Sequence, residues 1–219
     1  MRGLSVGNFY SCNQIPTFAQ VETLQQWDEQ IVLAVNGLHT AWLDTAMIVT
    51  TQTGFWTPLF LLIIIVLFKK YPAAGAWIVL AGVALTILLS DQVTSGLMKP
   101  FFERLRPSHH PALAGQLHLV DGYTGGRFGF ASSHAANSFA LATVLFFSVR
   151  NSLRGIPWLF LWAVFMCFTR LYLGVHYLTD LLAGAAVGLV AGTVGFGAII
   201  FLRNKFGTSV PSNTENHRG

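Results

Sequence analysis

A short stretch between two long apolar segments carries side chains that could perform chemistry together. It contains Arg170, His176 and Asp180. If the chain continues there as a helix, His176 and Asp180 are four residues apart and share one face. A carboxylate in that position can accept the Nδ1 proton of the imidazole, which leaves Nε2 free as an acceptor or nucleophile. The pattern therefore indicates an attack by His176 on phosphorus that gives a phosphohistidine.

Cationic side chains suited to a phosphoryl group stand where two of the apolar segments end. Lys99 and Arg106 lie at the end of one apolar segment, and Arg170 lies at the end of another. An arginine fork can bind two oxygens at once, whereas lysine acts as a point charge. We expect all three side chains to bind phosphate oxygens.

A further cluster, Ala131-Ser132-Ser133-His134, stands where the polar region enters the next apolar segment. Hydroxyls and free backbone N–H groups at a helix start suit an anion, so Ser132 and Ser133 are predicted to contact the phosphate. His134 would protonate the leaving oxygen and then take a proton from water. Asp180 would stabilise the imidazolium of His176. Charge stabilisation and positioning suffice for such a reaction, so we expect neither a metal nor another cofactor.

Taken in order, the motifs Lys-x6-Arg-Pro, Ser-x-His and Arg-x5-His-x3-Asp resemble the type 2 phosphatidic acid phosphatase (PAP2) superfamily, which also includes vanadium haloperoxidases and glucose-6-phosphatase. The similarity covers about residues 55–200. It implies a helical membrane fold and a metal-independent phosphatase mechanism through phosphohistidine. The resemblance implies the same roles as those given above for seven residues, which are Lys99, Arg106, Ser132, His134, Arg170, His176 and Asp180.

Three positions depart from the family pattern. Ala131 and Ser133 replace the proline and glycine of Pro-Ser-Gly-His, and Thr169 replaces the serine that usually opens the third motif. Threonine keeps the hydroxyl. If the glycine requires a positive φ, a serine at position 133 is expected to be strained.

The composition is that of a membrane protein. Hydrophobic residues make up 53% of the 219 residues and charged residues only 10%, with a mean hydropathy of +0.55. Soluble domains carry about 25% charged residues. The net charge of +4 is scattered between apolar segments, which argues against a nucleic-acid partner. Cys167 lies inside an apolar run and is interpreted as a packing residue.

The apolar segments predict an all-α, polytopic membrane helix bundle of about six transmembrane helices, similar to the PAP2 fold. A weaker segment, 31–50, is either an imperfect spanning helix or an interfacial helix followed by a short span. We expect a polar N-terminal segment (1–20), a single transmembrane catalytic domain (21–203) and a polar C-terminal tail (204–219). The five clear segments are 55–68, 72–97, 134–149, 156–172 and 181–202.

Basic residues between these segments fall into two groups. By the positive-inside rule, the larger group faces the cytoplasm. We therefore expect a protein of a bacterial inner membrane with its active site on the periplasmic face. The cytoplasmic group is Lys69, Lys70, Arg150, Arg154, Arg203, Lys205 and Arg218. The opposite group is Lys99, Arg104, Arg106, Arg127 and Arg170.

Several other polar and aromatic residues lie outside these motifs. For some of them the sequence leaves two interpretations open. Arg104 and Arg127 either steer an anionic headgroup or are plain loop charges. Asp91, inside an apolar segment, either supports the site or makes a packed hydrogen bond. Histidines 109, 110 and 118 are expected to be solvated, and Trp42, Trp56 and Tyr123 to be interfacial.

These features predict an integral membrane phosphatase whose partners are a lipid phosphate substrate and membrane lipids. Candidate substrates are undecaprenyl diphosphate, phosphatidylglycerol phosphate, phosphatidic acid and a lipid A phosphate. The alternative is a non-enzymatic transporter or proton relay that uses the same His, Arg and Asp residues. The sequence leaves the oligomeric state open, because Gly184, Gly188 and Gly192 could pack within one chain or between chains.

Overall fold

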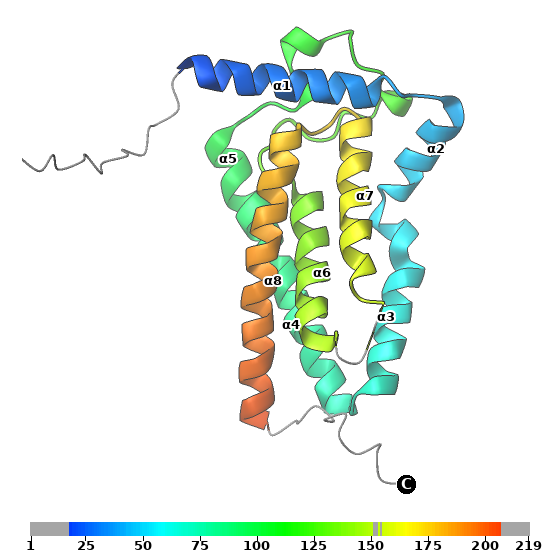
Figure 1. Ribbon diagram of the computed structural model, residues 1–219, viewed down its shortest axis with the longest axis vertical. Coiled ribbons are helices and arrows are strands. Elements are labelled where there is room, and N and C mark those ends of the chain that lie inside the picture. Colours follow the sequence, from blue (N-terminus) through cyan, green and yellow to red (C-terminus); the bar gives the residue numbers. More distant parts are fainter. Residues whose placement is uncertain (1–17, 151–152, 154, 207–219) are drawn as a thin grey trace, which may run out of the picture.

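The computed structural model describes residues 18–150, 153 and 155–206, and this part of the chain forms a helical bundle capped by α1 (Figure 1). A π-helical stretch, Gln92–Met98, joins α4 to α5. The helices are α1 (Phe18–Asn36), α2 (Ala41–Thr50), α3 (Thr57–Lys70), α4 (Ala73–Asp91), α5 (Lys99–Phe102), α6 (Ser133–Val149), α7 (Trp158–Tyr172) and α8 (Leu178–Phe206). Short 3-10 turns occupy Thr53–Trp56, Pro107–His109, Pro111–Leu113 and Val120–Gly122.

The predicted spanning segments are all helical. Thr53–Lys70, Ala73–Phe102 and Leu178–Phe206 are long and apolar enough to cross a membrane, and α6 and α7 are shorter apolar helices. The all-α membrane bundle is therefore confirmed. Several segment ends differ from the prediction by a few residues, and the largest difference is that the second clear segment continues beyond residue 97 to Phe102. Pro100 lies just after the π-helical stretch Gln92–Met98, inside a helix that is continuous from Ala73 to Phe102.

The weak segment 31–50 divides into two helices. Helix α1 ends at Asn36, and the axes of α1 and α2 differ by 115°. Gly37 follows α1 directly and donates its N–H to the carbonyl of Leu33 (2.8 Å), which closes the last turn. Helix α1 lies across one end of the bundle, the end farthest from the C-terminus of α8, and α2 leads from there toward α3 (Figure 1). The outer end means this end, the one that α1 covers. The segment is therefore not one continuous helix, and the choice between an imperfect spanning helix and an interfacial helix followed by a short span stays a prediction.

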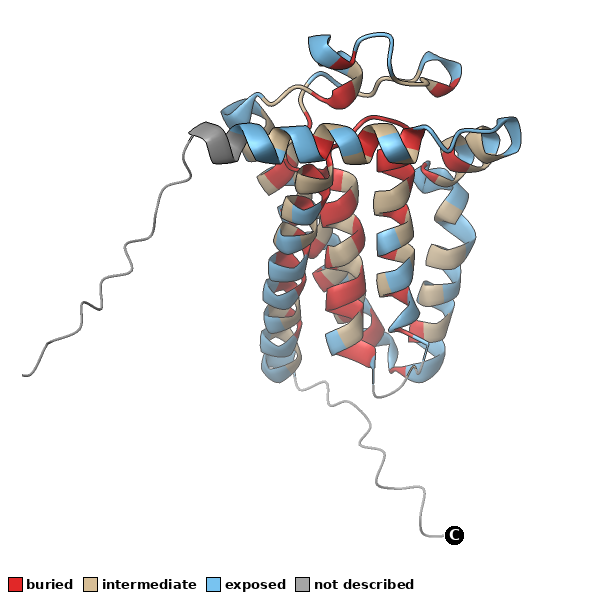
Figure 2. Cartoon of the chain, turned by 45° about the horizontal axis from the view of Figure 1, so that its top comes forward, coloured by how far each residue is buried: buried red, intermediate tan, exposed pale blue. Residues whose placement is uncertain are grey.

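Helix α6 lies at the centre of the bundle and packs against α4, α7 and α8. The glycines of α8 make its contact with α6 possible. A Cβ atom at Gly184 would lie 2.3 Å from the carbonyl oxygen of Ser132, and one at Gly188 would lie 2.3 Å from that of Ala136. The glycine stripe therefore packs within the monomer. Exposed residues lie mainly on the outside of the helices and buried residues face the interior (Figure 2).

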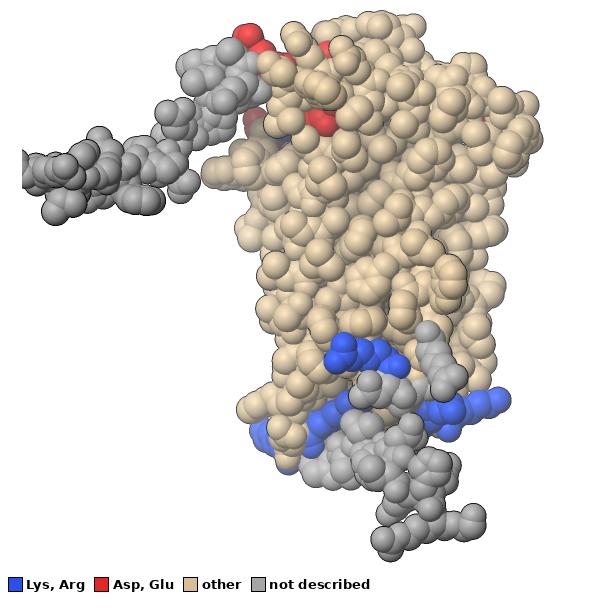
Figure 3. Space-filling view, viewed as in Figure 1, with Lys and Arg blue, Asp and Glu red and all other residues tan. Residues whose placement is uncertain are grey.

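The two ends of the bundle differ in charge. In Figure 3, Lys and Arg gather at the end opposite α1, where α3 ends in Lys69 and Lys70 and α8 ends with Arg203 and Lys205. Arg150 follows α6 at the same end. The predicted grouping of these cations is thereby confirmed for the described residues. Arg154, Arg218, residues 1–17 and residues 207–219 lie outside the described part, so the proposed segment boundaries stay predictions.

Candidate active site

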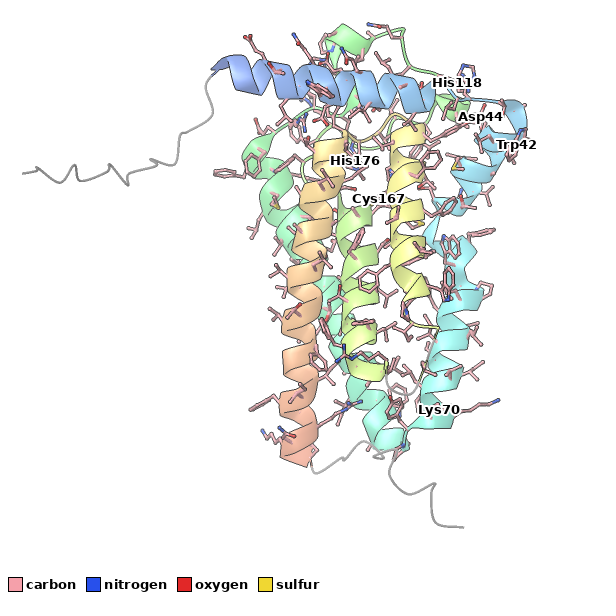
Figure 4. All side chains as sticks on the ribbon, in the orientation of Figure 1. Trp42, Asp44, Lys70, His118, Cys167 and His176 are labelled. Atoms are coloured by element: carbon pink, nitrogen blue, oxygen red, sulfur yellow. The ribbon has the colours of Figure 1, made fainter. Side chains whose placement is uncertain are left out.

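The three motifs meet at the end of the bundle that α1 covers. Lys99 stands on α5, His134 is in the first turn of α6, and His176 lies in the loop that joins α7 to α8. Figure 4 shows His176 beside the outer ends of α7 and α8, with Lys70 at the far end of the bundle. Because these three elements end at the same level, chain segments far apart in the sequence can build one pocket.

His176 and Asp180 are paired, as the spacing predicted, although His176 precedes α8 rather than lying on it. Nδ1 of His176 is 3.4 Å from Oδ2 of Asp180, and both side chains are buried. The backbone N–H of Tyr177 donates to the same oxygen at 3.1 Å. Gly174, with φ of +65°, makes the turn that brings the histidine back over the start of α8. The geometry directs Nδ1 to the carboxylate and leaves Nε2 available.

The surroundings of His176 keep its imidazole neutral. Burial lowers its pKa well below the usual value, and the positive charges of Arg106, Arg170 and Lys99 lower the pKa further. A neutral imidazole is the form that can act as a nucleophile. The same positive charges are the groups that would attract a phosphate to this nitrogen.

Lys99 is held by hydroxyl groups at the start of α6. Its Nζ donates to Oγ of Ser133 at 2.6 Å and to Oγ of Ser95 at 3.2 Å. Thr94 also donates to Ser133, at 3.0 Å. Ser133 begins α6 and, among the described residues, the non-glycine residues with positive φ are Glu103 and Asp121. The expected strain at Ser133 is therefore absent, and its hydroxyl anchors Lys99 instead.

Arg106 is positioned by a pairing between two loop segments. Its backbone N–H donates to the carbonyl of Arg127 at 3.1 Å, and Gly129 N–H donates to the carbonyl of Arg104 at 2.9 Å. The Arg106 side chain is buried and donates through Nε to the carbonyl of Phe128 at 3.1 Å. Burial and the nearby charge of Arg170 lower the pKa of Arg106 to about 10, so the guanidinium stays charged at neutral pH.

Arg170 is almost completely buried, with 1% of its surface exposed. It donates through Nη1 to Oγ1 of Thr51 (2.8 Å) and through Nη2 to the hydroxyl of Tyr123 (3.0 Å). Within the described part of the chain, its Nε atom has no hydrogen-bond partner. A buried guanidinium without a carboxylate partner is costly unless it meets an anion. Tyr123, predicted as an interfacial aromatic, is thus part of the site.

The start of α6 is fixed to the start of α8. Ser132 is the N-cap of α6, where its Oγ accepts from the N–H of Ala135 at 3.5 Å. Its own N–H donates to the carbonyl of Asp180 at 3.0 Å. Gly129 lies against the same residue, because a Cβ there would be 2.8 Å from Oδ2 of Asp180 and 3.6 Å from Nδ1 of His176. The loop backbone therefore approaches the pair closely.

An apolar cavity of about 420 Å³ extends from Ser133 and His134 into the bundle between α3, α4, α6 and α7. Aromatic and aliphatic side chains line most of it. Asp91 also faces it and accepts a hydrogen bond from Ser95 Oγ at 3.2 Å, which is the packed hydrogen bond that one interpretation expected. The apolar lining includes Trp56, Phe60, Ile87, Leu141, Trp162 and Met166.

Sequence reasoning missed two polar clusters around the site. Arg104 contacts Asp28 and Asp180, both at 2.7 Å, and is neither a free loop charge nor an exposed headgroup contact. His118 was expected to be solvated, but its Nε2 lies 2.8 Å from Oδ2 of Asp44. No local pattern marks these pairs, because their members are far apart in the sequence.

Comparison with known proteins agrees with this geometry. A family model described as the PAP2 superfamily matches residues 75–201. The chain is 38% identical to a lipid A 4'-phosphatase of Bacteroides thetaiotaomicron, over 83% of this chain and 78% of the relative. It is 32% identical to a lipid A 4'-phosphatase of Porphyromonas gingivalis, over 88% and 82% respectively. The crystal structure of LpxE from Aquifex aeolicus superposes with a TM-score of 0.59 at 26% identity, covering 77% of this chain and 93% of LpxE.

The family match spans more than half of the chain and contains all three motifs. The enzyme interpretation is therefore confirmed over that of a transporter or proton relay. This chain belongs to the PAP2 superfamily and is a membrane phosphatase of that family.

Proposed function

We propose that this phosphatase removes a phosphate group from lipid A, through a phosphohistidine at His176 and without a metal. Two relatives that align over most of their length are lipid A 4'-phosphatases, which supports the choice of substrate. The observation that carries the proposal is the junction between two environments. The cationic pocket around His176 borders an apolar cavity that begins at Ser133 and His134. A phosphate joined to a hydrocarbon chain is complementary to both.

The first chemical step forms a bond between His176 and phosphorus. Nε2 attacks phosphorus while Asp180 holds the Nδ1 proton, and the bond from phosphorus to the lipid oxygen breaks. His134 donates a proton to that leaving oxygen. The charge on the phosphoryl oxygens is met by Lys99, Arg106 and Arg170, so the required positive charge comes from side chains.

The second step returns the enzyme to its starting state. His134, now neutral, takes a proton from a water molecule, whose oxygen attacks phosphorus. The bond between phosphorus and His176 breaks, inorganic phosphate leaves, and His176 is again a neutral imidazole. Ser133, at the start of α6, is proposed to offer its backbone N–H to the phosphate. For Ser132 the proposed phosphate contact is its hydroxyl, because its N–H is bound to the carbonyl of Asp180.

We further propose that the protein lies in a bacterial inner membrane with this pocket on the periplasmic face. The cations at the opposite end of the bundle support that orientation, because Lys and Arg beside spanning helices favour the cytoplasmic side. A lipid would then present its phosphate at headgroup depth, where Lys99 emerges from α5.

A substrate panel tests the proposal. Purified protein in detergent with EDTA is offered lipid A, phosphatidylglycerol phosphate, phosphatidic acid and undecaprenyl diphosphate, and released phosphate is measured. We expect the highest kcat/KM for lipid A. His176→Ala should abolish release, whereas His109→Ala, which changes an exposed histidine on the same face, should not. Preference for another lipid would overturn the substrate, and wild-type rates from His176→Ala would overturn the mechanism.

A further inference from the structure

Asp28 of α1 reaches the catalytic loop although α1 lies outside the residues that the family model matches. Its side chain is 2% exposed. Oδ1 accepts the backbone N–H of Thr179 at 3.0 Å, and Oδ2 accepts the hydroxyl of the same threonine. Thr179 immediately precedes Asp180. One buried carboxylate of α1 therefore holds the chain at the first turn of α8.

Arg104 connects this carboxylate to the catalytic one. Its Nη2 donates to Oδ2 of Asp28 at 2.7 Å, and its Nη1 donates to Oδ1 of Asp180 at 2.7 Å. The guanidinium also lies over the ring of Tyr177, 4.3 Å from its centroid. Further hydrogen bonds run to Thr179 and Gln25, at 2.6 and 2.7 Å. The planar fork of arginine suits such a bridge between two carboxylates.

The contacts divide the two oxygens of Asp180 between different tasks. Oδ1 is taken by Arg104, and Oδ2 faces Nδ1 of His176 and the N–H of Tyr177. With Oδ1 fixed, the carboxylate cannot rotate away from the imidazole without losing a charged hydrogen bond. The orientation of His176 thus depends on Arg104, and that of Arg104 depends on Asp28.

We propose that Arg104 and Asp28 are positioning residues for the phosphatase reaction, and that α1 is required for the chemical step because it supplies Asp28. This inference rests on the proposed phosphohistidine mechanism. Neither residue is placed in contact with the phosphate, so both act through Asp180. The expected effect is therefore on kcat, not on the affinity for substrate.

The first test compares Asp28→Asn with Glu22→Gln, which removes an exposed negative charge from the same helix. Both variants are assayed on lipid A and on a soluble phosphate monoester, with folding checked by thermal unfolding. We expect Asp28→Asn to lower kcat by up to about a hundredfold with KM unchanged, because a small misplacement of a catalytic group can cost that much in rate. Glu22→Gln should keep the wild-type kcat.

The second test uses chemical rescue. Arg104 is 24% exposed, so a small cation can reach the space that Arg104→Ala leaves. We expect millimolar guanidinium to restore kcat in Arg104→Ala but not in Asp180→Asn, and sodium chloride at equal ionic strength to restore neither. Where Arg104→Ala does not fold, Arg104→Lys serves in its place for the kcat measurement, with a partial loss expected because lysine cannot bridge both carboxylates.

The outcomes distinguish a failure of the positioning role of Arg104 and Asp28 from a failure of the proposed function on which that role rests. Folded Asp28→Asn with wild-type kcat on either substrate overturns the positioning role. A raised KM at unchanged kcat in an Arg104 variant overturns it as well, because Arg104 would then contact the substrate. If the wild type cleaves the soluble monoester but not lipid A, only the proposed substrate fails. If the wild type releases phosphate from neither, the proposed function and this inference both fail.

Discussion

At the outer end of the bundle, buried charges hold one another through directed hydrogen bonds, whereas in its interior α4, α6 and α8 pack through small side chains. Arg170, His176 and Asp180 are at most 1% exposed and each has a polar neighbour. Below them, Gly188 meets Ala136 and Ala140, and Gly195 meets Thr86. The named residues of both regions are buried, but they are held by different contacts.

The difference shows how stability and chemistry are separated along the bundle. In the interior, close approach of helices supplies dispersion contacts and tolerates no added volume. At the outer end, each charged group is costly unless its partners are in place. A substitution in the interior should therefore act mainly on folding. One at the outer end that keeps the fold should act mainly on rate.

Among substitutions that leave every catalytic side chain in place, the largest effect on rate is expected from Gly129→Ala. The added Cβ would lie 2.8 Å from Oδ2 of Asp180, a distance that forces the carboxylate or the loop to move. Because Asp180 orients His176, we expect kcat to fall by about a hundredfold or more. Gly126→Ala is the matched control, since nothing lies within 4 Å of a Cβ there. Phosphate release from lipid A, measured beside thermal unfolding, distinguishes lost positioning from lost folding, and a Gly129→Ala rate equal to wild type would contradict the geometry.

The largest effect on stability is expected from Gly188→Ala. Its Cβ would lie 2.3 Å from the carbonyl oxygen of Ala136 and 2.9 Å from the backbone of Ala140, so α8 must move away from α6. Overpacking of this kind costs about 1–3 kcal/mol. Gly197→Ala changes the same helix where no atom lies within 4 Å. Thermal midpoints in detergent should fall for Gly188→Ala and not for Gly197→Ala. Equal midpoints would mean that α6 and α8 do not pack this closely.

The smallest effect concerns pH. The pKa of folded His176 lies below its usual value of about 6.5. As pH falls below that value, the unfolded chain binds a proton that the folded chain does not, so His176 makes the protein less stable in acid. His176→Gln removes the titrating side chain, and with it this difference in proton binding between the folded and unfolded chains. Between pH 7.5 and 5, the thermal midpoint of the wild type should fall more than that of His176→Gln. Parallel curves would contradict a neutral, buried His176.

The sequence predicted the parts of the site that are encoded locally. Motif spacing identified Lys99, Arg106, His176 and Asp180, and apolar runs located the helices that carry them. Partners from remote segments were missed. Tyr123 reaches Arg170 from the segment between α5 and α6, and Thr51 reaches it from the end of α2. Only the folded chain brings these residues together.

The same reason explains the misinterpretation of Arg104. Read alone, it is one of several loop cations, and Asp28 is one acid of a helix in which 9 of the 19 residues are polar. Their contact depends on how α1 lies across the outer end, which follows from the 115° bend after Asn36. The periodicity of apolar residues along the sequence does not indicate that angle.

Trapping the phosphorylated enzyme tests the central claim most directly. Wild-type protein and His134→Ala are mixed with lipid A, quenched in alkali, where phosphohistidine survives, and digested for mass spectrometry. The mechanism predicts phosphate on the peptide that contains His176 in both proteins, formed and lost more slowly in His134→Ala because that variant lacks the acid of the first step and the base of the second. Lipid hydrolysis that proceeds with no phosphate on His176 in either protein, or with phosphate on another residue, would contradict it.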